Sequence, residues 1–464
     1  MYNIDLKEIL GNEEVTLHEM LDARERRAWE QKRISAEYNM TIISFTLNIP
    51  GSYKLFPLAE KTFDEGRTLI CRHLKRHNIN IQYTKDNSSK TGCEIIYAVD
   101  CEAAFIKRLM AEIENSCMLG RIFDIDVLNS KGDKISREDI GYENRICLLC
   151  RDFAHVCSRS KKHKKEELIT RTIEIILDYF REQFADTCSS CASRALLYEV
   201  MTTPKPGLVD RANNGSHRDM DIYTFVDSSS SLTSYFRDFV TAGIKYHRDE
   251  PEKLFAKIRY IGMQAEDDMF RATCGINTHK GLIFSLGIIC SALGYLFANN
   301  KNTDTESILE LSKKMTAGVL KDFENITKNN ARTYGESLYA NYGITGIRGE
   351  AANGFISVKK YGLPILKRLL DKGLSLNDAG ALTLLNLIAN VKDTNIISRT
   401  DINTQERVQN NIKNIIEQNK IEKISISDIE NIDKQFIGMN ISPGGCADLL
   451  AITYMLHFIQ SPAE

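Results

Sequence analysis

One long apolar stretch without a charged residue, GLIFSLGIICSALGYLF at residues 281–297, places the strongest constraint on the fold. Its 17 residues are at the short edge of what an α-helix needs to cross a bilayer. Glycines and serines interrupt the stretch, and the rest of the chain, with 43% hydrophobic and 26% charged residues, has a globular composition. We therefore expect a helix buried in the core of a soluble domain, and no membrane partner.

The net charge and the cysteine content indicate which partners the protein can bind and in which compartment it resides. The formal net charge is −2, so no overall field would attract nucleic acid or an anionic membrane. Twelve cysteines are too few for a disulfide scaffold in 464 residues and suit a reducing compartment. The first residues, MYNIDLKEILGNEE, lack the basic and apolar segments of a signal peptide. We expect a cytoplasmic protein with no nucleic-acid partner.

The pattern of expected elements changes along the chain, which predicts a multidomain protein. In the first third, helical periodicity at residues 15–35, 56–77 and 102–115 alternates with strand patterns at residues 41–49, 79–84, 93–99 and 121–128. This mixture predicts an α/β or α+β domain. A basic run follows, RSKKHKK, which favours a solvated linker or helix start over a nucleic-acid patch. We place the boundary near residue 165, giving domains 1–165 and 166–464.

Beyond this boundary the sequence predicts an all-α domain. No convincing strand pattern intervenes between the helical segments, which lie at residues 193–201, 254–273, 282–297, 306–327, 354–371 and 378–389. The polar residues 401–440 fit either a mobile excursion or helices joined by loops.

Two carboxylates stand out in the last expected strand of the first domain. In GRIFDIDVL the strand period of two puts Asp124 and Asp126 on one face and the apolar residues on the other. Neighbouring carboxylates repel each other, and Mg²⁺ relieves that repulsion. The pattern therefore suits Mg²⁺ bound against a triphosphate, although an exposed strand face would give the same pattern.

Two further motifs accompany this strand. FTLNIPGSYK, residues 45–54, is an expected strand that leads through a Pro-Gly turn to Lys54, which suits phosphate contact. RICLLCRDFAHVCSRSKKH, residues 145–163, holds three cysteines and a histidine in the spacing C-x₂-C-x₆-C-x₅-H. Together the three motifs resemble those of the apo-citrate lyase phosphoribosyl-dephospho-CoA transferases, over residues 5–165.

This resemblance implies a nucleotidyltransferase-type domain. A serine hydroxyl of the citrate lyase acyl carrier protein would attack the α-phosphate of a triphosphoribosyl-dephospho-CoA, and pyrophosphate would leave. Asp124 and Asp126 would act in catalysis as Mg²⁺ ligands, and three basic residues would neutralise developing phosphate charge. Those three are Lys54, Arg121 and Arg145.

The cysteine-rich segment also suggests a zinc site. Cys147, Cys150, Cys157 and His163 could bind Zn²⁺ tetrahedrally, since C-x₂-C supplies two thiolates at once. The alternative is reduced core cysteines on an amphipathic helix, with the first two on one face. A later C-x₂-C pair, at residues 188–191, has no second pair nearby and reads as structural.

Five stretches of the helical domain are rich in ionisable or amide side chains, most of them with glycines. They are TPKPGLVDRANNGSHRDMD, GMQAEDDMFRATCGINTHKG, YGITGIRGEAANGF, KDTNIISR and SPGGCADLL. None is a Walker A loop, and GITGIRG does not follow a strand, so a Rossmann fold is not expected. Together they resemble the triphosphoribosyl-dephospho-CoA synthases over residues 185–460, with Cys446 where that family has serine. The chain thus resembles a fusion of two enzymes.

The second resemblance implies that ATP and 3′-dephospho-CoA are substrates. The 2′-hydroxyl of dephospho-CoA would attack C1 of the ATP ribose, and adenine would leave. Displacement at an anomeric carbon builds positive charge on the sugar, which a carboxylate stabilises. The adenine needs a proton, the hydroxyl must lose one, and the triphosphate needs Mg²⁺.

These stretches supply the candidate residues of the second domain. The prolines and glycines of the first shape a loop for a polyanion and its metal, although a solvated polar loop is the alternative. Glu266 lies on the apolar face of its helix, where a carboxylate is costly unless paired or metal-bound. Residues 277–280 precede a helix whose positive N-terminal end favours phosphate, with capping as the alternative. KDTNIISR resembles a helix-capping turn and has no assigned role. The catalytic candidates are His217, Asp219 and Glu266; the Mg²⁺ candidates are Asp210, Asp219, Asp221 and Asp268; the substrate or phosphate contacts are Lys205, Asn277, His279, Lys280, Arg348, Glu350 and Asp448.

Two other functions compete with this hypothesis. An ADP-ribose-processing, Mg²⁺-dependent hydrolase with an accessory N-terminal domain would release adenine from ATP without dephospho-CoA. A zinc-containing scaffold for lyase assembly would leave carrier modification intact after Asp124→Asn and Asp126→Asn.

Overall fold

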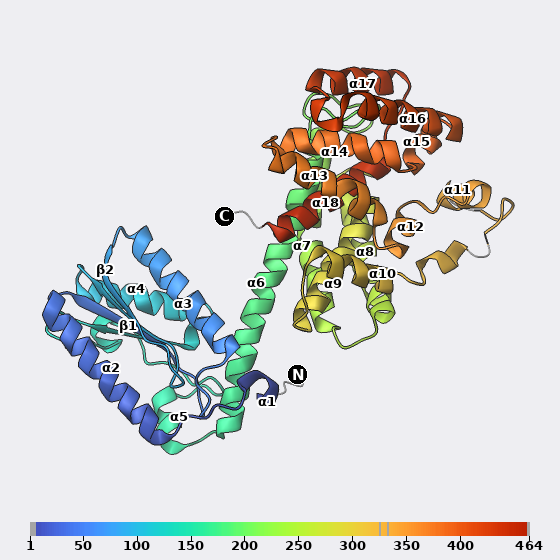
Figure 1. Ribbon diagram of the computed structural model, residues 1–464. Helices are drawn as coiled ribbons and strands as arrows, with labels where there is room; N and C mark the ends of the chain where they lie inside the picture. Colours follow the sequence, from blue (N-terminus) through green and yellow to red (C-terminus); the bar gives the residue numbers. More distant parts are fainter. Residues whose placement is uncertain (1–5, 324–325, 332–333, 462–464) are drawn as a thin grey trace. The chain divides into compact units, whose positions relative to one another are not determined.

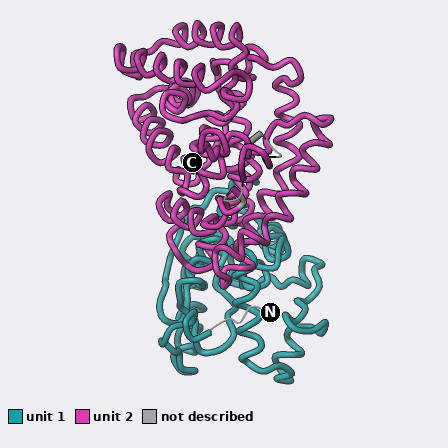
Figure 2. The backbone as a smooth tube through the Cα atoms, turned by 90° about the vertical axis from the view of Figure 1, so that its right-hand side faces the viewer, with its two compact units in different colours: residues 1–180 teal, residues 181–464 magenta. Residues whose placement is uncertain are grey.

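The computed structural model describes residues 6–323, 326–331 and 334–461 (Figure 1). The chain forms two compact units, residues 1–180 and residues 181–464 (Figure 2). Helix α6 (Lys165–Met201) is continuous through this division, and the boundary expected near residue 165 falls at its first residue.

Unit 1, residues 1–180, is built around an antiparallel sheet in the order β2-β3-β1-β4-β5. Each of the four expected strands is present, and a two-residue strand at the sheet edge is an addition to them. The strands are β1 (Thr41–Leu47), β2 (Ile81–Asp86), β3 (Glu94–Val99), β4 (Phe123–Leu128) and β5 (Lys134–Ile135). The mixture of helices with a small antiparallel sheet confirms the α+β expectation.

Helices cover both faces of this sheet (Figure 1). On one face Phe45 of β1 stacks on Phe63 of α3, with ring centroids 4.8 Å apart. On the other face Ile34 of α2 packs in a cluster with Ile42 of β1. The helices of unit 1 are α1 (Leu6–Leu10), α2 (Leu17–Tyr38), α3 (Pro57–Arg76), α4 (Ala103–Ser116) and α5 (Ala154–Ser160). Since side chains alternate along a strand, the two carboxylates of β4 share the face that α2 partly covers.

Unit 2, residues 181–464, is helical, and no strand occurs in its described residues, as expected. Its helices beyond α6 are α7 (Ile222–Lys245), α8 (Pro251–Ala272), α9 (Lys280–Ala298), α10 (Thr305–Met315), α11 (Tyr334–Tyr342), α12 (Gly346–Ala352), α13 (Leu363–Asp371), α14 (Leu376–Asn390), α15 (Thr394–Arg399), α16 (Ile402–Asn419), α17 (Ile426–Gly438) and α18 (Gly444–Gln460). The polar residues 401–440 therefore form helices.

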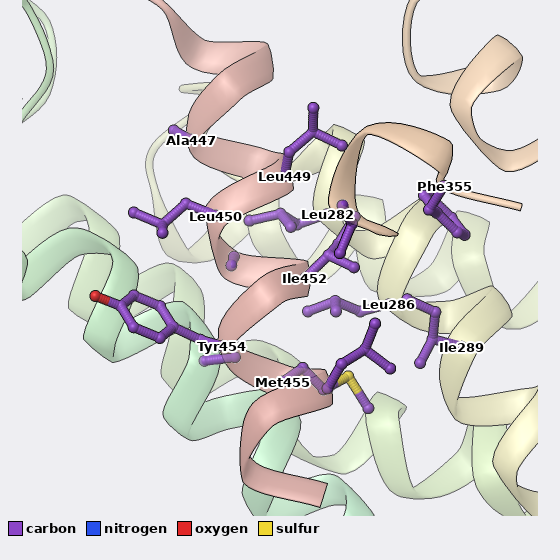
Figure 3. Packing of buried hydrophobic residues seen from close by; sticks show 14 of the residues in the cluster. Leu282, Leu286, Ile289, Phe355, Ala447, Leu449, Leu450, Ile452, Tyr454 and Met455 are labelled. Atoms are coloured by element: carbon purple, nitrogen blue, oxygen red, sulfur yellow. The ribbon is translucent and has the colours of Figure 1, made fainter. Parts of the chain in front are cut away.

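Helix α9 is the expected buried core helix. By length and composition it could cross a membrane, but 72% of its apolar window is buried inside the protein. A β-carbon at Gly294 would overlap the carbonyl of Val240, so the glycine permits close packing against α7. Figure 3 shows Leu282 of α9 beside Leu450 of α18 in the same core. This packing fixes the first turns of α9 and α18 relative to each other.

Two expected segments and one unexpected helix show where the structure differs from the sequence pattern. Helix α7 was not expected as a helix. The helix expected at residues 306–327 ends at Met315 and is followed by a 3₁₀ turn, Val319–Phe323; residues 324–325 lie outside the described parts. The helix expected at residues 354–371 begins with a π-helical turn, Val358–Gly362, because a proline enters the first turn of α13.

Candidate functional sites

The two carboxylates of β4 lie opposite polar side chains of β1. Asp124 pairs in register with Thr46, and Asp126 with Ser44. Asp126 forms an ion pair with Lys134 at 2.7 Å, whereas Asp124 has no hydrogen-bond or ion-pair partner among the described residues. Asp124 reaches solvent, but the protein packed around it partly desolvates the carboxylate. That desolvation and repulsion from Asp126 raise the pKa of Asp124.

Asp124 lines a recess of about 110 Å³ together with three cationic side chains. Arg24 and Arg27 come from α2, and Lys54 follows β1. Burial, and then repulsion from Arg24, lower the pKa of Lys54 to about 8. Arg27 is held by Glu94 of β3 at 2.6 Å. The structure thus brings together Lys54 and Asp124 as expected, and adds two arginines that carried no assigned role.

Arg121 and Arg145 do not line this recess. Arg145 donates a hydrogen bond to the Phe123 carbonyl at 2.8 Å and pairs with the buried Glu114 of α4. Arg121 donates to the carbonyl of Ile146. Both contacts hold the chain around the start of β4, and a phosphate contact for either arginine stays a prediction.

The four potential zinc ligands lie together in unit 1. The ligand atoms of Cys147, Cys150, Cys157 and His163 are all within 4.8 Å of one another. The amphipathic-helix alternative is wrong, because the first two cysteines lie in a bend and not in a helix. The cysteines at 188 and 191 are buried in α6, which agrees with a structural role.

Unit 2 contains a cavity of about 960 Å³ around which helices begin. Its lining includes residues from the first turns of the long helices α9 and α18 and of the short helices α12 and α15. The N-terminal turn of a helix carries free N–H groups and a positive partial charge, so such a wall favours an anion. The ionisable side chains of the lining are Glu199, Lys205, His217, His279, Lys280, Glu350, Lys392, Asp393, Arg399 and Asp448.

Asp448 is the most available of the carboxylates in this lining. It is partly exposed, it lies just after the first turn of α18, and it has no hydrogen-bond or ion-pair partner within the described ranges. Burial, and then repulsion from Glu199 and Asp393, raise its pKa well above the usual value. The other carboxylates are engaged: Glu199 with Lys205, and Glu350 with the hydroxyl of Ser357 at 2.6 Å.

Two histidines of the lining are neutral. Arg399 donates to Nδ1 of His217 at 3.1 Å, so Nε2 carries the proton and donates to Ser442 at 2.9 Å. Burial and Arg399 lower the pKa of His217 to about 4. His279 is buried with Nδ1 2.7 Å from Ser228 Oγ, and burial lowers its pKa to about 3. Its Nε2 has no partner among the residues described.

The loop at residues 203–221 is braced by its own polar groups. Lys205 is 1% exposed and its ammonium pairs with Glu199. Asp210 accepts backbone hydrogen bonds, from Lys205 N–H at 2.9 Å and Ala212 N–H at 2.7 Å. Asp221 caps α7 by accepting from Thr224 N–H at 2.9 Å. These contacts give the loop rigidity; metal ligation by the two aspartates stays a prediction.

The remaining candidates are distributed over different surfaces. Asp219 is exposed, with its carboxylate 3.9 Å from His217. Asp268 pairs with Arg271 and accepts from Tyr235. Within the described ranges, the cysteine-histidine group is the one group of three or more potential ligands close enough to hold an ion. A Mg²⁺ site would therefore use one or two carboxylates plus substrate phosphates.

Glu266 and Arg348 line a second cavity, of about 600 Å³, next to the first. Glu266 pairs with Lys280 at 2.9 Å, which supplies the partner that its position on the apolar face requires. Arg348 stands over the Phe323 ring. Asn277 accepts a hydrogen bond from Lys280 N–H at 3.3 Å, which fits the capping alternative.

Asp393 is a cavity residue that had no assigned role. It caps α15 as expected, accepting from the N–H groups of Asn395 at 2.8 Å and Ile396 at 3.3 Å. Its second oxygen accepts from Cys446 N–H at 2.7 Å, in the first turn of α18. A capping pattern was visible in the sequence, but the long-range bond to α18 was not. Glu199 could not be predicted either, because it lies in a helix that carries no recognisable motif.

Comparisons with known proteins divide the chain at nearly the same place as its two units. A family model described as apo-citrate lyase phosphoribosyl-dephospho-CoA transferase matches residues 15–179. A second, described as ATP:dephospho-CoA triphosphoribosyl transferase, matches residues 185–464.

Individual relatives agree with both matches. The protein CitXG of Haemophilus influenzae is 33% identical over 95% of this chain and 95% of its own length. The protein CitXG of Leuconostoc mesenteroides is 33% identical over 96% of this chain and 97% of its own. The 2-(5″-triphosphoribosyl)-3′-dephosphocoenzyme-A synthase of Haemophilus ducreyi is 36% identical over 66% of this chain and 97% of its own length.

Proposed function

Because the chain belongs to the apo-citrate lyase phosphoribosyl-dephospho-CoA transferases in unit 1 and to the ATP:dephospho-CoA triphosphoribosyl transferases in unit 2, we propose a division of chemistry between the two sites. The protein is a bifunctional transferase that makes the prosthetic group of citrate lyase and attaches it. Unit 2 joins ATP to 3′-dephospho-CoA with release of adenine. Unit 1 transfers the product to a serine of the citrate lyase acyl carrier protein with release of pyrophosphate.

One observation carries the assignment in unit 2: Asp448, a carboxylate with no partner in the described part of the chain, stands among the first turns of helices that favour an anion. The ATP triphosphate would lie against the first turns of α9 and α18, near Lys280. The Nε2–H of His279 would be a further donor at this end of the cavity, since Nδ1 accepts from Ser228 and the ring is neutral.

Asp448 would then act on the sugar and the attacking hydroxyl. Its raised pKa makes it a competent acceptor for the proton of the 2′-hydroxyl. Before it takes up that proton, the carboxylate would stabilise the positive charge that develops at C1, and the departing adenine would take a proton from solvent, which balances the step. His217, whose two ring nitrogens are engaged by Arg399 and Ser442, would position this end of the cavity.

The second cavity would receive the apolar arm of dephospho-CoA. Phe255 and Phe284 contribute aromatic surface to it, and Arg259 and Arg348 contribute positive charge. Consecutive residues of α9 face the two cavities, with Leu282 in the first and Ile283 in the second. Nucleophile and ATP would therefore approach each other from two sides of the first turn of α9, with Glu266 and Lys280 paired between them.

In unit 1 we assign a nucleotidyltransferase-type site to the recess beside β4. Asp124 and Asp126 fit Mg²⁺, since they are neighbouring carboxylates on one strand face and Asp124 has no side-chain partner among the residues that the structure describes. A bound Mg²⁺ would neutralise charge on the α-phosphate. Lys54 and Arg24 would stabilise the departing pyrophosphate, which carries most of the developing negative charge.

One assay tests both assignments. The protein is incubated with ATP, dephospho-CoA, Mg²⁺ and apo carrier protein, and free adenine and carrier mass are followed. Asp448→Asn should lower adenine release by about 100-fold or more. Asp124→Asn and Asp126→Asn should release adenine normally but leave the carrier unmodified, whereas the exposed Asp100→Asn is the matched control.

The same assay separates the competing functions, which the family assignment does not favour. Adenine release from ATP in the absence of dephospho-CoA would point to a hydrolase. Normal carrier modification by the double variant of Asp124 and Asp126 would point to a scaffold, with another enzyme in the preparation.

A further inference from the structure

The three thiols and one imidazole of unit 1 come from three short segments that the backbone folds against one another. Cys147 and Cys150 lie in a bend, Cys157 lies in α5, and His163 lies in the link between α5 and α6. Cys150 Sγ is 3.4 Å from Cys157 Sγ and 3.3 Å from His163 Nε2. All four ligand atoms lie within 4.8 Å. A tetrahedral centre with Zn–S bonds of about 2.3 Å needs ligand atoms separated by roughly 3.8 Å, so small adjustments would complete it.

The bend that carries the first two cysteines is closed by backbone hydrogen bonds. Cys147 N–H donates to the Asp152 carbonyl at 2.8 Å, and Ala154 N–H donates to the Arg145 carbonyl at 2.7 Å. Leu149 N–H donates to Cys147 Sγ at 3.5 Å, which stabilises a thiolate at that position. The bend therefore presents two sulfurs on its inner side without any contribution from a helix.

The chain then turns back so that His163 reaches the same point. Lys161 ends α5 in the left-handed region, with φ of 49°. Lys162 N–H donates to the Cys157 carbonyl at 3.2 Å, and the Lys162 ammonium pairs with Asp152 at 2.5 Å. These two contacts hold the segment that leads to His163 against the bend.

We propose that Cys147, Cys150, Cys157 and His163 bind one structural Zn²⁺. Three thiolates and one imidazole are soft ligands that select zinc over Mg²⁺ or Ca²⁺. Four protein ligands fill a tetrahedral shell and leave no position for substrate, so the ion would stabilise the fold and take no part in catalysis. Binding releases the thiol protons to solvent, and the remaining net negative charge is offset by nearby lysines such as Lys162.

The contacts of the bend show what the ion would stabilise. Ile146, next to the first ligand, accepts a hydrogen bond from Arg121. Arg145, two residues before that ligand, donates to the Phe123 carbonyl at the start of β4. The zinc centre would thus fix the segment that holds the first residues of the strand bearing Asp124.

Metal content of the full-length protein tests the proposal directly. After gel filtration, elemental analysis should find about one zinc per chain. Cys150→Ser should lose most of that zinc, and Cys71→Ser, which removes an exposed thiol of the same unit, should keep it. His163→Cys should retain zinc in a four-thiolate shell, while His163→Ala should not.

A second measurement does not depend on the folding of any variant. Replacing the metal of the unaltered protein with Co²⁺ should produce the charge-transfer and visible bands of tetrahedral thiolate coordination. Absence of these bands after Co²⁺ exchange, or peptide mass analysis showing a disulfide between Cys150 and Cys157, would overturn the proposal. A zinc-selective chelator, added with Mg²⁺ in excess, should lower carrier modification while adenine release by unit 2 continues.

Discussion

Gly281 and Asp448 lie in contact where the first turns of α9 and α18 meet, and a β-carbon at residue 281 would overlap the Asp448 carboxylate. The glycine is therefore needed for the close approach of the two helices at the wall of the large cavity. The same relationship fixes the carboxylate that we assign to the chemistry of unit 2.

Gly281→Ala should disable adenine release by displacing Asp448. A displacement of about 1 Å is enough to cost on the order of 100-fold in rate, so we expect a loss of that size in kcat. Far-UV circular dichroism should be nearly unchanged. The control is Gly438→Ala, at the end of α17, where no atom lies within 4 Å of the added carbon. Equal activity in both variants would exclude this role for Asp448.

The rate of carrier modification should fall as the pH rises through about 8. The pKa of Lys54 is lowered to about 8, so its ammonium is charged below this pH and neutral above it. A neutral side chain cannot stabilise the departing pyrophosphate. In Lys54→Arg the decline should disappear, because a guanidinium stays charged. Adenine release by the same preparation gives the reference profile, and a decline shared by both activities would contradict the assignment.

Removing one partner of the buried pair Lys205–Glu199 should destabilise unit 2. Lys205→Met leaves a buried carboxyl without its cation, which costs about 3–5 kcal/mol in the free energy of unfolding. Replacing both, Lys205→Met with Glu199→Leu, should recover much of that loss. Urea unfolding followed by far-UV circular dichroism reports mainly on the helical unit, while the fluorescence of Trp29, the single tryptophan, reports on unit 1. A double variant as unstable as the single one would argue against the pair.

Asp393→Ala should cost both stability and activity. It removes the cap of α15 and the bond to Cys446 N–H, together worth about 2–3 kcal/mol. The first turn of α18 would then be free to move, so adenine release should fall as well. Asp401→Ala is the matched control, since Asp401 caps α16 through Thr404 N–H at 2.9 Å, away from the cavity lining. It should lose only about 1 kcal/mol and keep its activity.

The sequence predicted the elements whose pattern of apolar residues matches the faces that they bury, such as the strands of unit 1 and the apolar helix α9. It did not predict α7, whose serine run lowers helix propensity. In the structure Ser229 and Ser230 donate to the carbonyls of Phe225 and Val226, both at 2.8 Å. Packing against α9 supplies the stability that the local sequence lacks.

The site could be predicted as a set of stretches, but not as a set of contacts. The motifs pointed to Asp448 and to the four potential zinc ligands, which lie within about twenty residues of one another in the chain. Asp393 and Glu199 act through partners far away in sequence, and no local pattern reveals such a bond. The arginines of α2 show the same limit. In the sequence, arginines that line a phosphate recess look the same as arginines on an exposed helix face.

Helix α6 contains the residues that separate the two enzyme families, and it has no break there. The residues that join the two family matches are therefore helical and do not form an extended linker. A cut within this helix would leave backbone carbonyls without hydrogen-bond donors at the end of one half, and backbone N–H groups without acceptors at the start of the other. Anyone wishing to produce the halves separately should give each of them a full copy of this helix, with the natural flanks Lys164 and Thr202 as end points.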